Sequence, residues 1–169
     1  APAVYQVSIT GPHGNSAAGD TPSRQRIFTA RPASAEEAEA CAEKVLSFLL
    51  RRAWRRPVTA EDVARFLPFF RESGKDGFDA GIEGALSAIL VSREFLFRVE
   101  KEPGDLPPGT PYRITDIELA SRMSFFLWSS IPDDELLEAA VGGRLSQPGE
   151  IERQTRRMLA DRRSFNLAT

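Results

Sequence analysis

Residues 34–49 read Ser-Ala-Glu-Glu-Ala-Glu-Ala-Cys-Ala-Glu-Lys-Val-Leu-Ser-Phe-Leu. Apolar side chains recur in this stretch at intervals of three and four, which places one set on a single helical face: Ala38, Cys41, Ala42, Val45, Phe48 and Leu49. Ser34 and Glu37 have the spacing of a capping box, in which two side chains bond each other's backbone N–H groups. The stretch therefore predicts a helix that begins after Pro32 and buries one face.

Two further helices are predicted between this one and residue 102. Thr59 with Asp62 marks a helix start, and a stripe of four apolar residues follows it: Val63, Phe66, Leu67 and Phe70. A turn at residues 74–77 leads to a helix with its own apolar face: Phe78, Ile82, Ala85, Leu86, Ile89 and Leu90. The Gly- and Pro-rich segment 103–111 then predicts a linker.

Three more helices are predicted after the linker. Thr115 with Glu118 opens the first, whose main stripe is Leu119, Ala120, Met123, Phe126 and Leu127. Phe125 and Trp128 fill its other faces, so we expect this helix to be the most buried one. A helix over residues 133–141 ends at two glycines, and the last helix begins after Ser146. Its expected inward residues are Ile151, Thr155, Met158 and Leu159.

The residues before Pro32 have a different pattern. Residues 4–10 alternate and are rich in β-branched and aromatic types, which predicts one short strand, followed by an irregular lead-in to residue 32. We therefore predict an all-α bundle of six to seven short helices behind one N-terminal β-strand. The expected units are residues 33–102 and 112–169, joined by the linker at 103–111.

Composition excludes several classes of function. The chain has 169 residues, and 22 basic against 24 acidic residues give a net charge of −2, which argues against a dedicated nucleic-acid binder. The single cysteine, Cys41, and the single histidine, His13, exclude an intrachain disulfide, a multi-histidine metal site and a Cys-x-x-Cys-His haem attachment. No apolar run approaches the roughly 18 residues that a membrane-spanning helix needs, so we expect no such helix in this sequence.

A basic cluster surrounds a tryptophan at the end of the first predicted helix: Arg51, Arg52, Trp54, Arg55 and Arg56. One interpretation is an anion or nucleic-acid site in which Trp54 stacks on a base. The other is a basic helix C-terminus that complements the helix dipole, with Trp54 in the core. We favour the second, because four charges in an acidic chain attract nucleic acid weakly.

Acidic residues give two further candidates. Asp133 and Asp134 stand at a predicted helix start, where they could act as acid and base or hold a hard cation. We favour capping and a dipole interaction, because neighbouring positions diverge by roughly 100° on a helix. Glu118 and Arg122 are four apart, which predicts an ion pair between them. Alternatively, they reach partners on another segment, for which Arg98 and Glu100 are candidates because they flank the linker.

The remaining candidates favour core packing over chemistry. Cys41 lies on an apolar face, which is typical of a small core residue, and the same holds for Met123 and Met158 as alternatives to haem ligands. Ser129 and Ser130 have no companion histidine nearby for a serine hydrolase. We therefore predict no catalytic, cofactor-binding or metal-binding residue in this chain.

Two blocks of sequence resemble known families. Residues 52–59 (Arg-Ala-Trp-Arg-Arg-Pro-Val-Thr), with 81–82 and 88–100 (Ala-Ile-Leu-Val-Ser-Arg-Glu-Phe-Leu-Phe-Arg-Val-Glu), resemble one planctomycete cytochrome c-associated domain family of unknown function. Residues 112–136, which include Ser-Arg-Met-Ser-Phe-Phe-Leu-Trp at 121–128, resemble the start of a second such family. Other members of the second family continue well beyond this length, so the unit at 112–169 is expected to be truncated.

The resemblance implies a context and no site residues. Members occur in large exported bacterial proteins beside cytochrome c-like segments, which implies an exported chain, partners within the same polypeptide, and haem, if present, elsewhere in it. The leading hypothesis is a non-catalytic structural or interaction module. The alternatives are part of an enzyme active site for a polysaccharide or redox substrate, completed by other domains, and a nucleic-acid module that uses residues 51–56.

Overall fold

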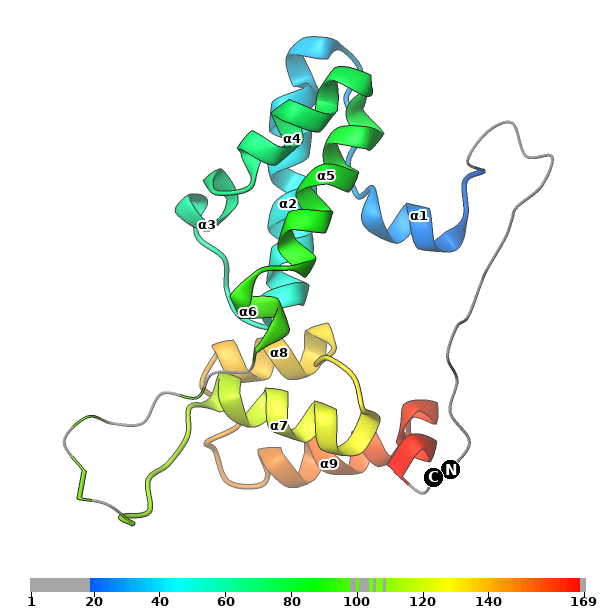
Figure 1. The fold of residues 1–169 in the computed structure, drawn as a ribbon. Helices are drawn as coiled ribbons and strands as arrows, with labels where there is room; N and C mark the ends of the chain where they lie inside the picture. Colours follow the sequence, from blue (N-terminus) through cyan, green and yellow to red (C-terminus); the bar gives the residue numbers. More distant parts are fainter. Residues whose placement is uncertain (1–18, 98–99, 101–103, 105, 108, 168–169) are drawn as a thin grey trace, which may run out of the picture.

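The computed structural model describes residues 19–97, 100, 104, 106–107 and 109–167 (Figure 1). These residues are helical and contain no strand, which confirms the helical class, while the strand predicted at residues 4–10 lies outside them. The α-helices are α1 (Pro22–Ile27), α2 (Ala38–Trp54), α3 (Ala60–Ala64), α4 (Leu67–Ser73), α5 (Phe78–Leu90), α6 (Arg93–Leu96), α7 (Asp116–Trp128), α8 (Asp134–Val141) and α9 (Glu150–Ala160). Three 3₁₀ helices join them: η1 (Ala35–Glu37), η2 (Gly74–Asp76) and η3 (Arg162–Leu167).

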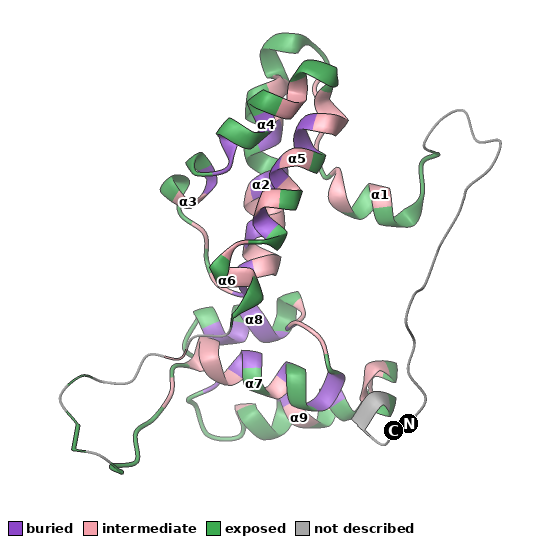
Figure 2. Ribbon diagram, viewed as in Figure 1, coloured by how far each residue is buried: buried purple, intermediate pink, exposed green. Residues whose placement is uncertain are grey.

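The first core lies where α2, α4 and α5 pack side by side (Figures 1 and 2). Its apolar members include Val45, Leu46, Leu50, Phe66, Phe70, Ile82 and Ile89. Four of these have no exposed surface, and burying such a side chain stabilises the fold by about 1.5–3 kcal/mol. Gly81 lets α4 and α5 approach closely, because a Cβ at this position would lie 2.6 Å from the Phe70 ring.

The second core lies between α7, α8, α9 and η3. Trp128 is its largest fully buried side chain, and its indole N–H donates a hydrogen bond to the Met158 carbonyl oxygen at 2.9 Å. The buried apolar residues of the two cores form separate clusters. The members of the second cluster are Ala120, Leu127, Trp128, Leu136, Ala139, Ala140, Leu145 and Met158. Each group of helices therefore has its own apolar interior.

Local sequence signals set the starts of two helices, α3 and α7. Thr59 with Asp62 and Thr115 with Glu118 form complete capping boxes at the starts of α3 and α7, as their spacing predicts. The same prediction is wrong for Ser34, whose side chain makes no capping bond, because residues 35–37 form η1 and α2 begins only at Ala38. These two capping boxes confirm the predicted starts at residues 59 and 115.

Some helix faces that the sequence predicts to be buried are exposed in the structure. Phe126 is 71% exposed and Phe125 39%, so the expectation that these two side chains of α7 are buried is wrong. Helix α7 packs against α8, α9 and η3, and Phe125 and Phe126 lie on the part of its surface that these elements leave exposed. In α9 the inward residues are Gln154 and Met158, and the predicted Ile151 and Leu159 are exposed.

Helix α1 lies in the lead-in that was predicted to be irregular. Thr21 caps it by accepting a hydrogen bond from Arg24 N–H at 3.2 Å, and Pro22 fits its first turn because that position needs no backbone N–H. The predicted helix over residues 63–70 is also divided, into α3 and α4. Because short helices such as α1 and α6 were not predicted, the described residues contain more helices than the expected six to seven.

Candidate functional site

The basic segment 51–56 lies at the junction of the two cores and divides its side chains between two surroundings. Arg51 Nη1 lies 3.1 Å from Asp134 Oδ1, and its Nη2 lies 3.9 Å from Glu138 Oε1. Arg52 Nη1 lies 3.6 Å from Asp134 Oδ2. These ion pairs connect the C-terminal end of α2 to α8. In Figure 1, α8 lies directly beneath α2 and α6.

Trp54 belongs to the first core. It is 5% exposed, its indole N–H donates to Ser92 Oγ at 3.0 Å, and its ring meets Phe66 edge to face at 5.7 Å between centroids. The guanidinium groups of Arg56 and Arg65 lie 4.7 and 5.3 Å from the ring centroid. Because core residues and arginines cover the ring, no face of it is open to stack on a base.

Arg55 and Arg56 follow Trp54 and terminate α2. Arg55 has a left-handed backbone, with φ of 57°, and its buried guanidinium donates to the carbonyl oxygens of Ala53 at 2.8 Å and Glu94 at 3.1 Å. Arg56 forms a double hydrogen bond to the Asp62 carboxylate at 2.7 and 3.0 Å. The Arg56 hydrogen bond lowers the pKa of Asp62 to about 2, although burial acts in the opposite direction.

A cavity of about 620 Å³ separates the segment 54–56 from the start of α7. We call it the junction cavity and define it by its lining residues: Trp54, Arg55, Arg56, Arg93, Glu94, Phe97, Thr115, Ile117, Glu118 and Ser121. The first six come from the end of α2 and from α6 with its following residue, and the other four come from α7 and its cap. Residues of both groups of helices therefore face the same space.

Glu118 and Arg122 take separate partners in the structure. The Glu118 carboxylate accepts hydrogen bonds from the backbone N–H and the hydroxyl of Thr115, both at 2.8 Å, as part of the capping box. Arg122 Nε donates to Glu100 Oε1 at 2.7 Å, and its Nη2 donates to the second carboxylate oxygen. The partner reached on another segment, Glu100, is therefore the one that Arg122 takes.

Asp133 and Asp134 point to different parts of the molecule. Asp133 caps α8 by accepting from Leu136 N–H at 3.0 Å, and it holds Arg157 through hydrogen bonds of 2.6 and 2.9 Å. Burial would raise the pKa of Asp133, but the bonds from Arg157 and Leu136 outweigh this and lower it. Asp134 faces Arg51 and Arg52 instead. The two carboxylates therefore do not converge on a shared ligand.

An arginine cluster on η3 and α9 encloses Trp128, and sequence reasoning missed it. The Arg163 guanidinium lies 3.5 Å from the Trp128 ring centroid and is bonded to Asp161 at 2.7 Å. Arg157, on α9, lies 5.7 Å from the same ring. The Arg163 hydrogen bonds hold the pKa of the Asp161 carboxyl well below its usual range. The apolar stripe predicted for the last helix gave no signal for the contacts of Arg157 and Arg163 with Trp128, because these residues are far apart in the sequence.

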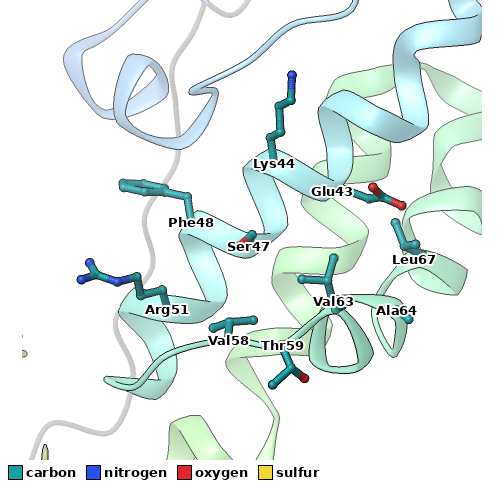
Figure 3. Close-up of a pocket in the computed structure, with 11 residues that line it drawn as sticks. Glu43, Lys44, Ser47, Phe48, Arg51, Val58, Thr59, Val63, Ala64 and Leu67 are labelled. Carbon is teal, nitrogen blue, oxygen red and sulfur yellow. The ribbon is translucent and has the colours of Figure 1, made fainter. Parts of the chain in front are cut away.

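A second cavity, of about 590 Å³, lies between α2 and α3. Figure 3 shows that Val63 points from α3 toward α2, whereas Lys44 extends from α2 away from α3. Its walls are largely apolar, and its charged residues, Glu43, Lys44 and Arg51, come from one side of α2. Among the residues that the structure describes, no group of three His, Cys, Asp or Glu side chains is arranged to hold a metal ion.

Comparisons with known families match two separate segments. Residues 41–100 match a family described as PSD5, protein of unknown function (DUF1595), and residues 114–169 match one described as PSD4, protein of unknown function (DUF1592). Both families are uncharacterised. No curated protein and no solved structure matches the chain. The matches therefore show similarity to two domains of unknown function, in the same order as the two cores.

The search for a membrane-spanning element gives a negative result for the described residues. None of the helices formed by residues 19–97 and 109–167 combines the length and the apolar character needed to cross a bilayer.

Proposed function

We propose that this chain is a non-catalytic structural or interaction module of a larger exported protein that also carries cytochrome c-like segments. The resemblance described above supports the exported, cytochrome-associated context. The matches to two domains of unknown function agree with a module that has no recognised reaction. On this proposal the partners are other domains of the same polypeptide, and haem is bound in those domains.

One observation carries the structural role: the charged candidates connect helices. Arg51 and Arg52 connect α2 to α8, Arg122 binds Glu100, and Arg157 binds Asp133. A general acid or base needs a pKa near the working pH, whereas the pKa of Asp133 is lowered. On this proposal Arg51 and Arg52 hold the two cores together, and Arg122 and Arg157 fix neighbouring segments to α7 and α9.

Visible absorption spectroscopy tests the proposal. The chain and the complete protein in which it occurs are purified in parallel, and haem gives a strong absorption band near 400 nm. The proposal expects this band from the complete protein and none from the chain. A haem band from the chain itself would place the redox chemistry in these residues and overturn the non-catalytic assignment.

Substitution and localisation provide two independent checks. Asp133→Ala and Asp134→Ala should change stability and leave any activity of the complete protein at the wild-type level when both proteins are folded. A loss of turnover with unchanged stability would favour an active-site role instead.

Fractionation of the producing cell should find the complete protein outside the cytoplasm, and a cytoplasmic location would contradict the exported context.

A further inference from the structure

The junction cavity contains two polar groups that the rest of the described structure leaves unused. Arg93, on α6, is exposed, and its guanidinium makes no hydrogen bond or ion pair with a described residue, although it interacts electrostatically with the neighbouring Glu94. Ser121, on α7, is 4% exposed, and its buried hydroxyl has no hydrogen-bond partner among the described residues. A buried hydroxyl without a partner is unfavourable, and a serine in a helix ordinarily bonds a preceding carbonyl oxygen. Ser124, one turn later, does so through the Ser121 carbonyl at 3.0 Å.

The other charged groups around the cavity already have partners. Arg56 is bonded to Asp62, Arg55 donates to two backbone carbonyls, and the Glu118 carboxylate belongs to the α7 cap. Glu94 lies 3.3 Å from Arg65. Among the described residues, we count the charged side chains that line the cavity together with their ion-pair partners. The positive ones are Arg55, Arg56, Arg65 and Arg93, and the negative ones are Asp62, Glu94 and Glu118, which leaves one positive charge in excess. The surplus charge favours a single anionic group.

The walls of the cavity are suited to an apolar body. Phe97 is 61% exposed, and it lines the cavity together with Ile117 and Trp54. A volume of about 620 Å³ is in the range of small-molecule sites, which combine apolar walls with a few polar groups that orient the ligand. Phe97 and Ile117 come from the two groups of helices that the cavity separates. A ligand between them would contact both.

We propose that the junction cavity binds a small organic acid whose carboxylate is attached to an aromatic or other apolar body. The carboxylate pairs with the Arg93 guanidinium and accepts a hydrogen bond from the Ser121 hydroxyl. The apolar body lies against Phe97 and Ile117. This inference goes beyond the structural role proposed above and does not rest on it, because the site is defined by unused groups of this chain.

Titration of the folded chain with benzoate tests the proposal, followed by calorimetry and by NMR chemical-shift changes. Saturable binding in the submillimolar to millimolar range is expected, with the largest shifts at residues 93–97 and 115–121. Arg93→Gln should weaken binding at least tenfold, and Ser121→Ala about threefold or more. The matched control is Arg26→Gln, which removes an exposed arginine of α1 outside the cavity and should leave affinity unchanged.

Two analogues separate the parts of the site. Benzamide has the same ring without the charge and should bind at least tenfold more weakly than benzoate. Acetate has the carboxylate without the ring and should also bind at least tenfold more weakly. Because Arg93 is exposed, Arg93→Gln should keep the wild-type circular dichroism spectrum, so its effect reports binding. The proposal is overturned if benzoate shows no saturable binding, or if Arg93→Gln and Arg26→Gln bind it equally well.

Discussion

The two cores are stabilised by different kinds of contact. In the first core, the buried side chains of α2, α4 and α5 are almost all apolar, and helices approach as closely as Gly81 allows. In the second, buried polar side chains are interspersed with the apolar ones: Ser121, Ser124 and Gln154 are buried. Arginines lie against a core tryptophan in both cores, and in the second they also pair with Asp133 at the start of α8. Apolar packing carries no charge that acid can neutralise or salt can screen, whereas ion pairs weaken under both conditions. The second core should therefore respond more strongly to solution conditions.

The largest effect is expected from Trp128→Ala. This change removes the largest fully buried side chain of the second core and its hydrogen bond to Met158, and large-to-small changes of this type cost about 3–5 kcal/mol. Urea unfolding followed by circular dichroism would measure it. Phe126→Ala on the same helix is the control, because an exposed side chain should change stability by about 0.5 kcal/mol or less. Equal losses for the two variants would contradict the observed orientation of α7.

Gly81→Ala probes the close packing of the first core. The added methyl group would meet the Phe70 ring and lie 2.9 Å from its carbonyl oxygen, so the helices must move apart. Overpacking of this type costs about 1–3 kcal/mol, partly offset by the higher helix propensity of alanine. We expect a net loss of about 1–2 kcal/mol, measured by thermal unfolding. Gly19→Ala, where a Cβ meets nothing within 4 Å, should show no such loss.

Asp133→Asn tests the charged contacts of the second core. It weakens the cap of α8 and the double hydrogen bond from Arg157, and we expect a loss of about 1–2 kcal/mol at pH 7. Raising the salt concentration to about 1 M should reduce the difference between wild type and variant, because the Debye length falls to about 3 Å. A difference that does not change with salt would indicate that the cap alone stabilises this end of α8.

Asp62→Asn makes the matching change beside the first core, and it gives a pH dependence. The folded pKa of Asp62 is about 2, below its ordinary value of 3.8, so the ionised form is favoured by folding. Its stabilisation is present above about pH 4 and is lost as the pH falls toward 2. After allowance for the solvent contact of Arg56, we expect about 1 kcal/mol at pH 7. Stability curves of wild type and variant from pH 7 to 2 should converge at the acidic end.

The double variant Arg51→Gln/Arg52→Gln should have the smallest effect on stability. Its ion pairs to α8 are partly exposed, and such pairs contribute about 0–1 kcal/mol. The two cores should therefore unfold at nearly the wild-type denaturant concentration. Small-angle scattering is the sharper measurement, because loss of the pairs should broaden the distribution of distances between the cores. An unchanged distribution would mean that other contacts orient them.

Sequence reasoning succeeded where the determining contacts are local. The capping boxes at Thr59 and Thr115 join residues three apart, so the chain itself contains the whole signal. The exposed faces of α7 and α9 could not be predicted in the same way, because periodicity shows that a face is apolar and not which helices cover it. The long apolar face of α7 therefore predicted burial for Phe126, which is exposed.

For the candidate site residues too, contacts between distant segments were harder to predict than local ones. Arg122 with Glu100 was among the predicted alternatives because Glu100 flanks the linker, and the structure contains that pair. Arg157 with Asp133 joins residues 24 positions apart on different helices, and no spacing rule identifies it. The unused groups of the junction cavity, Arg93 and Ser121, had no sequence signal, because a missing partner is visible only in three dimensions.

The positions of the two tryptophans have a practical consequence. The chain has two, and Trp54 and Trp128 each lie in a different core. Their intrinsic fluorescence therefore provides one native optical label per core, and replacing either with phenylalanine isolates the emission of the other. Fluorescence of the two single-tryptophan chains during unfolding would show directly whether the cores melt together or in sequence.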